Sequence, residues 1–278
     1  AYPDSIGGSL SALRRALAAL PSGTLSGLHI LPVYPSSSDR GFAPCTHTEV
    51  DARWGTWADI EAIAQEYDVV LDLIINHISA GSPEFQDFLR KGDASEHKDL
   101  FIDVDTFLAT HGAERHQLAK TYRPRPTPPY TRFRCGDGKA HDIWTTFSPE
   151  QIDINWDSEP AWELMRRYVT TLTTHGVSML RLDAMGYVAK RPDTTCFMIP
   201  ETFSMAQRLR SEVPQDVALL AEVHTNYKAQ QALLAASDIE YTYDSALALV
   251  MLHTIWTRDA TRLKEWIAAR GDRQITVL

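Results

Sequence analysis

Short apolar runs alternate with amphipathic stretches along most of the chain, and this pattern predicts strands followed by helices. Leucines recur at steps of three and four between residues 10 and 20, which is the spacing of one helical face. Residues 27–31 and 68–75 are nearly continuous apolar runs of the kind found in parallel sheets covered on both faces. An amphipathic stretch at 57–66 lies between them, so the first part of the chain is expected to form a strand–helix–strand unit.

The same alternation returns after residue 155. We expect strands at 179–182, 217–223, 239–243 and 274–278, and helices that start at 158 or span 201–212, 228–236, 245–256 and 259–270. Strand–helix alternation over this length predicts an α/β fold with a parallel sheet. Polar residues follow five or six of the strands and no glycine-rich phosphate loop is found, which favours a closed barrel with its active site at the carboxyl ends of the strands.

Residues 79–148 break this pattern. The segment is polar and contains the proline-rich run at 123–129. A long irregular segment inside a barrel pattern is typically an inserted subdomain or a binding loop. We therefore expect a catalytic barrel formed by residues 1–78 and 149–278, with an inserted domain at 79–148.

Composition and charge narrow the choice of partners and compartment. The net charge is −9 and the sequence pI is about 5.5, so a nucleic-acid partner is not expected. The cysteines, Cys45, Cys135 and Cys196, fit neither a disulfide framework nor a zinc site, which indicates a reducing compartment. No signal peptide and no apolar run of membrane-spanning length is found, so we expect a cytoplasmic protein without a membrane partner.

Two carboxylates occur at the ends of predicted strands, Asp183 after the strand at 179–182 and Glu222 near the end of 217–223. Side chains alternate between faces along a strand, so Arg181 and Asp183 point the same way. Two carboxylates facing one another across a pocket are the groups that cleave glycosidic bonds. A structural Arg–Asp pair and a surface glutamate explain these two motifs equally well when they are taken alone.

Other polar residues are also ambiguous one by one. Asp72 lies inside an apolar strand and must be paired or hydrogen-bonded there, which is compatible with a bracing role. His77 is compatible with a structural loop histidine. Asp39 begins a segment, 39–42, whose glycine at position 41 is typical of a turn.

Taken together, seven motifs resemble glycoside hydrolase family 13, the α-amylase clan, and within it the sucrose phosphorylase group. In chain order they are GLHILP (27–32), DRGFAP (39–44), DLIINH (72–77), TYRPRP (121–126), QIDIN (151–155), RLDA (181–184) and AEVH (221–224). Tyr187 stands four residues after Asp183, where most of the clan carries His or Lys, as it does in the sucrose phosphorylase group. The resemblance implies a (β/α)8 TIM-type barrel, incomplete at both ends, with an irregular subdomain inserted after the third strand.

The resemblance also implies roles at the site. Asp183 would be the nucleophile of a retaining glycosyltransferase and form a β-glucosyl-enzyme, and Glu222 would be the general acid and base, in the more apolar position of the two. Arg181 would keep Asp183 ionised. The remaining substrate-binding positions would be Asp39, Phe42, His77, Tyr122, Tyr187 and His224, with His77 on the 6-hydroxyl of the glucosyl ring and Phe42 offering that ring an apolar face.

Phosphorolysis requires positive charge near the acceptor, so that phosphate attacks the intermediate in place of water. Arg123 and Arg125 lie on the stiff proline-rich loop, and the resemblance favours Arg125. No metal-ligand spacing is present and no cofactor is expected. The reaction implied is sucrose plus phosphate to α-glucose 1-phosphate plus fructose, by a parent protein that is expected to be a homodimer.

The family's third carboxylate, an aspartate after the seventh strand, would follow Leu278. We therefore expect the chain to be a truncated piece of the parent that is inactive or weakly active by itself. Other readings stay open: a phosphorylase of sucrose 6'-phosphate or glucosylglycerate, an α-glucosidase or transglucosidase of the clan, or a non-catalytic sugar-binding remnant. A divalent-metal barrel that uses Asp72, His77, Asp183 and Glu222 is the most distant of them.

Overall fold

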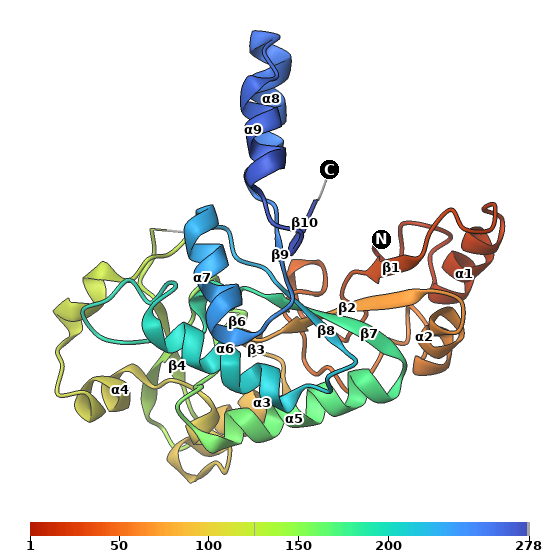
Figure 1. The fold of residues 1–278 in the computed structure, drawn as a ribbon. Helices are drawn as coiled ribbons and strands as arrows, with labels where there is room; N and C mark the ends of the chain where they lie inside the picture. The colour runs from red at the N-terminus through yellow and green to blue at the C-terminus, as the bar shows by residue number, and fades with distance from the viewer. Residues whose placement is uncertain (125, 277–278) are drawn as a thin grey trace.

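The centre of the molecule is a single parallel sheet of six strands, seen in a computed structural model that describes residues 1–124 and 126–276. The strands lie in the order β1-β2-β7-β8-β9-β10, and every neighbouring pair is parallel. Their bounds are β1 Gly27–Ile30, β2 Asp68–Ile74, β7 Val177–Asp183, β8 Ala218–Ala221, β9 Tyr241–Tyr243 and β10 Gln274–Ile275. The sheet curls as part of a (β/α)8 barrel does, which agrees with the predicted fold class (Figure 1).

The strands are buried for the reason that the sequence pattern indicated. Val69, Leu71 and Leu73 on one face of β2, and Ile74 on the other, are all 0% exposed. Side chains on both faces of the strand are buried because the sheet is covered on both sides. Truncating one of these side chains, as in Leu71→Ala, would cost about 2–5 kcal/mol of stability.

One helix follows most strands and covers the sheet. The helices are α1 Leu10–Ala18, α2 Trp57–Ala64, α5 Glu159–Thr174, α6 Pro200–Glu212, α7 Tyr227–Ser237, α8 Leu247–Thr257 and α9 Thr261–Ala269. Ser9 is the N-cap of α1, and its hydroxyl accepts a hydrogen bond from the backbone N–H of Ala12 at 3.2 Å. The helix ends at Ala18, so Leu20, which is 43% exposed, lies outside the predicted apolar face. Within the two described ranges, none of the helices combines the length and apolarity that crossing a bilayer requires.

Residue Ala1 lies beside β1. Its amino group donates to the carbonyl of His29 at 2.6 Å, and its own carbonyl accepts from the N–H of Leu31 at 2.9 Å. These two bonds have the alternation of a parallel ladder. The edge of the sheet next to β1 is therefore partly paired.

The segment between β2 and β7 leaves and re-enters the barrel through one antiparallel pair, β3 His77–Ser79 with β6 Gln151–Asp153. It is more regular than its sequence predicts. It contains α3 Pro83–Lys91, α4 Val104–Thr110, the hairpin β4 Tyr130–Arg134 with β5 Ala140–Trp144, and the short turns η2 Gly92–Ala94, η3 Lys98–Leu100 and η4 Arg115–Lys120. Periodicity is hard to detect in helices of seven to nine residues, which explains the difference. The boundaries of an inserted domain at 79–148 remain a prediction.

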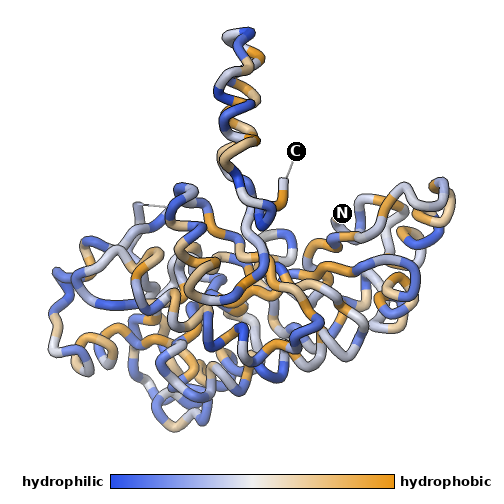
Figure 2. Tube along the Cα trace, in the orientation of Figure 1, coloured by the Kyte–Doolittle hydropathy of each residue, from blue (hydrophilic) through white to orange (hydrophobic). Residues whose placement is uncertain are grey.

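Helices α8 and α9 form a hairpin that projects away from the sheet (Figure 1). Neither helix has a buried residue. Leu249, Leu252, Ile255 and Trp256 are 63–90% exposed, and Figure 2 shows apolar positions along the length of this hairpin. An apolar helix normally buries one face, so these two helices gain less stability from packing than the helices that cover the sheet.

Candidate active site

The carboxyl ends of β7 and β8 bring Asp183 and Glu222 to one place. The two strands are in register, with Leu182 opposite Ala221, and the backbone N–H of Glu222 donates to the carbonyl of Leu182 at 3.0 Å. Arg181 and Asp183 share a face of β7 because they are two residues apart. The sheet therefore places one guanidinium and two carboxylates at its carboxyl edge, as the strand pattern predicted.

Arg181 contacts each carboxylate of this edge. Its Nη1 donates to Asp72 Oδ1 at 2.5 Å and to Asp183 Oδ1 at 2.9 Å, and its Nη2 lies 3.5 Å from Glu222 Oε1. Its Nε donates to the hydroxyl of Tyr243 at 3.0 Å. Three hydrogen bonds and one ion pair along a planar group fix the guanidinium, so its charge lies between the three acids.

Asp72 is the buried anchor of that arrangement. It is 0% exposed, and besides Arg181 it is paired with His29, whose Nε2 lies 3.0 Å from Asp72 Oδ2. The requirement that a buried aspartate be paired is thus met, although His29, which lies in the GLHILP motif, was not predicted as its partner. Asp72 and Asp183 share Nη1 of the guanidinium, and Glu222 lies beside Nη2.

Ala184, the residue after Asp183, has the left-handed backbone conformation (φ 55°). This conformation is costly for a residue with a Cβ atom and is found mostly where function requires it. Here it turns the Ala184 N–H toward Glu222, which accepts the hydrogen bond through Oε2 at 2.9 Å. The turn after the strand therefore fixes the Glu222 carboxylate next to Asp183.

The pKa values of the two acids move in opposite directions. Burial and the charge of Glu222 raise the pKa of Asp183 to about 7, and these effects outweigh the opposing effect of Arg181. Burial by itself would also raise the pKa of Glu222, but the hydrogen bond from His224 and the charge of Arg181 lower it below its usual range. The two acids titrate as a coupled pair, and their contacts favour the charged form of Glu222 over the charged form of Asp183.

This differs from the sequence prediction, in which Arg181 keeps Asp183 ionised and Glu222 has the more apolar position. Asp183 is 9% exposed and belongs to the buried class, whereas Glu222 is only partly buried. The decisive contact is His224, whose Nε2 lies 2.9 Å from Glu222 Oε1 and whose own pKa is raised by that bond. A motif that ends in histidine did not reveal that the histidine would bind the acid two residues before it.

A cavity of about 520 Å³ opens in front of these acids. Eight of the ten predicted site residues line it: Phe42, His77, Tyr122, Arg181, Asp183, Tyr187, Glu222 and His224. The loop that carries Tyr122 also contributes Pro124. The side chain of Asp39 and the whole of Arg125 lie outside the described residues, so their predicted contacts stay predictions.

Phe42 and His77 form the side of the cavity nearest β2. The Nε2 atom of His77 lies 2.8 Å from the backbone carbonyl of Phe42, and the Phe42 ring lies 5.6 Å from the guanidinium of Arg181. Gln151 adds a bond of 3.1 Å from its Nε2 to the same carbonyl. Because His77 and Gln151 lie on β3 and β6, this side of the cavity is built by the strands that join the insert to the barrel.

An aromatic wall adjoins them, and its Phe147 ring lies 5.4 Å from the ring of His77. The ring of Tyr187 lies 5.0 Å from Phe147, 4.8 Å from Phe197 and 6.1 Å from Tyr122, with which it is nearly parallel. Phe147, Gln151 and Phe197 line the cavity but were not predicted as site residues. Phe147 and Phe197 lie on loops without periodicity, whereas Gln151 belongs to the QIDIN motif, which gave an available signal.

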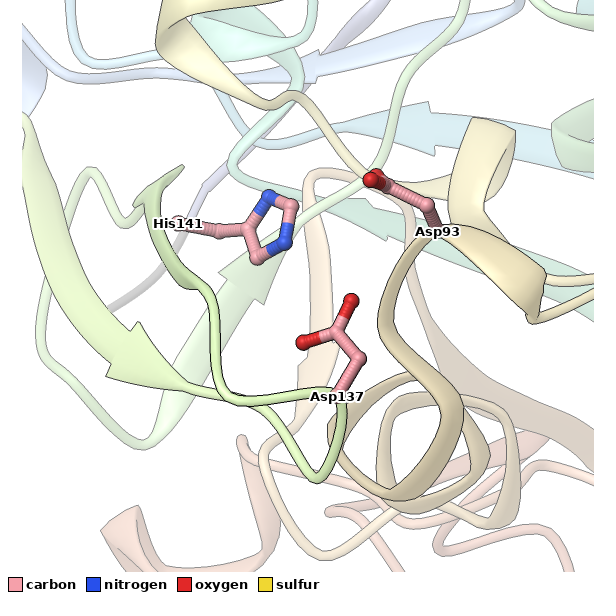
Figure 3. A group of neighbouring side chains, drawn as sticks. All are labelled: Asp93, Asp137 and His141. Atoms are coloured by element: carbon pink, nitrogen blue, oxygen red, sulfur yellow. The ribbon is translucent and has the colours of Figure 1, made fainter.

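In the described part of the chain, one group of side chains outside this cavity's lining could hold a metal ion. Asp93, Asp137 and His141 of the insert each offer an atom, and these atoms lie within 4.8 Å of one another (Figure 3). Lys139 forms an ion pair with Asp93, and His141 Nδ1 lies 3.0 Å from Asp103 Oδ2. Asp93 and Asp137 are exposed and none of the three lines the cavity, so the cluster plays no part in the chemistry considered below.

This chain is similar to known proteins along nearly its whole length. The model of the alpha-amylase catalytic domain matches residues 8–269. The glucosylglycerol phosphorylase of Marinobacter adhaerens is 38% identical and the sucrose phosphorylase of Bifidobacterium adolescentis is 37% identical, each over 100% of this chain. The alignments cover 57% and 55% of those proteins, so the chain spans little more than half the length of the curated relatives it matches.

Solved structures give the same picture. The crystal structure of sucrose 6F-phosphate phosphorylase from Thermoanaerobacter thermosaccharolyticum superposes with a TM-score of 0.93 and 36% identity, over 99% of this chain and 57% of that one. A trehalose-6-phosphate hydrolase from Bacillus licheniformis superposes with a TM-score of 0.72 over 87% of this chain and 47% of that one. Its 17% identity supports the fold alone.

Proposed function

The chain belongs to the alpha-amylase catalytic-domain family, and from that premise we propose that its site transfers a glucosyl unit from an α-glucoside to phosphate with retention of configuration. The observation that carries the proposal is Arg181, which contacts both Asp183 and Glu222 where they face a sugar-sized cavity. A retaining mechanism requires two carboxylates about 5–5.5 Å apart. Relatives that are 36–38% identical over nearly the whole chain are named as phosphorylases, which supports phosphate as the acceptor.

In the first step Asp183 is the nucleophile. A carboxylate oxygen attacks the anomeric carbon, the bond from that carbon to the leaving oxygen breaks, and Glu222 gives its proton to that oxygen. Asp183 must be ionised and Glu222 protonated, which is the reverse of the favoured arrangement described above. A donor that separates His224 from Glu222 would remove the bond that lowers the Glu222 pKa, and the shared proton would then move to Glu222.

In the second step phosphate attacks the glucosyl-enzyme. Glu222 takes the proton from the attacking phosphate oxygen, the bond to Asp183 breaks, and α-glucose 1-phosphate leaves. Positive charge is needed at the mouth of the cavity, where His224 lies with a raised pKa and a side chain that is 76% exposed. Arg125 is the other candidate. Pro124 lines the cavity next to it in the sequence, which supports a place for that loop at the acceptor side.

The donor ring would lie in the cavity lined by these residues. Phe42 and the aromatic wall offer apolar surface, and His77 and Gln151 offer polar atoms at its rim. We propose sucrose as the donor, with sucrose 6'-phosphate, glucosylglycerol and glucosylglycerate as the rivals, because phosphorylases with these names are among the relatives.

The test is a donor panel with the full-length gene product. Each of the four donors is incubated with and without inorganic phosphate, and glucose 1-phosphate and free glucose are measured separately. Phosphate-dependent release of glucose 1-phosphate supports the proposal, and the highest kcat/KM identifies the preferred donor. Release of glucose at the same rate without phosphate would identify a hydrolase instead, and Asp183→Asn should abolish either reaction.

A further inference from the structure

Lys190 is a buried cation close to the active site that the proposed mechanism does not use. It follows Asp183 by seven positions in the sequence and is only 4% exposed. Its Nζ lies 2.8 Å from Asp153 Oδ2, donates to Asn76 Oδ1 at 3.1 Å, and donates to the backbone carbonyl of Tyr187. A buried ammonium with three oxygen partners has all its donors satisfied, so this contact is specific.

The three partners come from three different parts of the fold. Asn76 follows β2 at the start of the insert, Asp153 ends the strand by which the insert returns, and Tyr187 lies in the short turn η5 Met185–Tyr187 after Asp183. No two of these parts are consecutive elements of the chain. Lys190 therefore connects the turn that follows Asp183 to both segments that join the insert to the barrel.

Each partner is directly joined to a residue that lines the cavity. Asp153 is the register partner of His77 in the β3–β6 pair, and Asn76 Nδ2 lies 3.4 Å from His77 Nδ1. The carbonyl that Lys190 holds belongs to Tyr187, the centre of the aromatic wall. Lys190 thus acts on both walls of the cavity and lines neither, since it is absent from the lining residues.

Asp153 is held by several hydrogen bonds at the junction formed by the β3–β6 pair. It is 0% exposed, and it accepts hydrogen bonds from the backbone N–H of Thr146 at 2.8 Å, from the Thr146 hydroxyl at 2.6 Å and from Asn76 Nδ2 at 3.1 Å. Among the described residues, Lys190 is its salt-bridge partner. Thr146 precedes Phe147, so the same carboxylate also fixes the backbone that carries a second ring of the aromatic wall.

We propose that Lys190 is a positioning residue for glucosyl binding: it fixes the position of the Tyr187 loop relative to the β3–β6 pair that carries His77. The proposal rests on the proposed function in so far as the ring bound in this cavity is a glucosyl unit. Losing the ammonium frees the Tyr187 loop and the β3–β6 junction from one another. A misplaced wall lowers both donor affinity and reactivity, because near-attack geometry tolerates little displacement.

The test compares two variants with a matched control, all made in the full-length gene product. Lys190→Met removes the ammonium. The double variant Lys190→Met with Asp153→Asn removes the charge on both sides, which keeps the comparison valid if the single variant does not fold. Arg210→Met is the control, because Arg210 is also 4% exposed and also binds backbone carbonyls, those of Val217 and Pro214 at 2.9 Å, but at the opposite end of β8 from Glu222.

Two measurements are made well below the unfolding temperature of each variant: donor kcat and KM, and calorimetric binding of 1-deoxynojirimycin as a glucose mimic. Both Lys190 variants should lower kcat/KM and weaken binding of the mimic by about tenfold or more. Arg210→Met should lower only the unfolding temperature. If the double variant keeps kcat/KM and binding within about twofold of the unmutated protein, the positioning role is refuted. Absence of phosphorolysis in the unmutated protein would refute the proposed function, while binding of the mimic would still report on Lys190.

Discussion

Replacing Asp183 by Asn should make the folded protein more stable at pH 8 but not at pH 4. The pKa of Asp183 is about 7 in the folded chain and 3.8 for an unperturbed aspartate. Between these values the folded state keeps a proton that the unfolded chain has released. Folding stability therefore falls as the pH rises through this window, and the contribution is fully lost above pH 7.

The size of the effect follows from the width of that window. A pKa difference of about three units corresponds to about 4 kcal/mol between the two limits. An asparagine does not titrate, so it escapes this loss. We expect the advantage of Asp183→Asn over the unmutated chain to grow by about 4 kcal/mol between pH 4 and pH 8, while the weaker pairing of the amide with Arg181 lowers the stability of the variant equally at both pH values.

The assay is urea unfolding at pH 4, 6 and 8, followed by circular dichroism, on the 278-residue chain. Asp153→Asn is the matched control, because Asp153 is also buried but its charge is compensated by Lys190, and its removal should destabilise the chain at pH 6 and at pH 8. An Asp183→Asn advantage that is the same at pH 4 and pH 8 would refute the reasoning, since the shared proton would then not reside on Asp183.

Three kinetic predictions follow from the same site. For sucrose, kcat/KM should fall as the pH rises through about 7, because the acid pair loses the proton that Glu222 must donate. For α-glucosyl fluoride, whose leaving group needs no proton, kcat/KM should rise over the same range as Asp183 ionises. Parallel pH profiles for the two donors would contradict the roles given to Asp183 and Glu222. His224→Ala should move the falling limb for sucrose to higher pH, since the hydrogen bond that lowers the Glu222 pKa is gone; an unmoved limb would show that this contact is not made in solution. Arg181→Lys should lower kcat/KM by about a hundredfold or more, because an ammonium cannot make the four contacts of the guanidinium; steady-state kinetics that stay within about tenfold of the unmutated protein would exclude the role given to Arg181.

The sequence was most informative where a periodic constraint operates. Continuous apolar runs predicted the buried strands, because a strand covered on both faces leaves no place for polar side chains. The two-residue period of β7 predicted that Arg181 and Asp183 share a face. Given parallel strands, the convergence of Asp183 and Glu222 at one edge then followed from chain direction alone.

The sequence was least informative where contacts between residues far apart in the chain determine the position or protonation of a side chain. The proton preference of the acid pair depends on His224, whose contact with Glu222 is set by loop conformation. Phe147 and Phe197 reach the cavity from loops that have no period. Lys190 was not singled out because a lysine in a polar loop is normally solvated, and its burial becomes evident only when Asn76 and Asp153 are brought beside it by the fold.

The hairpin of α8 and α9 affects how stability measurements on this chain should be made. Dyes that become fluorescent on apolar surface would bind Leu249, Leu252 and Ile255 in the folded protein, so thermal scans that use them would start from a high signal. Trp256, at 90% exposure, would contribute a solvent-like emission that unfolding hardly changes. Backbone signals such as far-ultraviolet dichroism avoid both backgrounds and are the appropriate measure of whether a variant is folded.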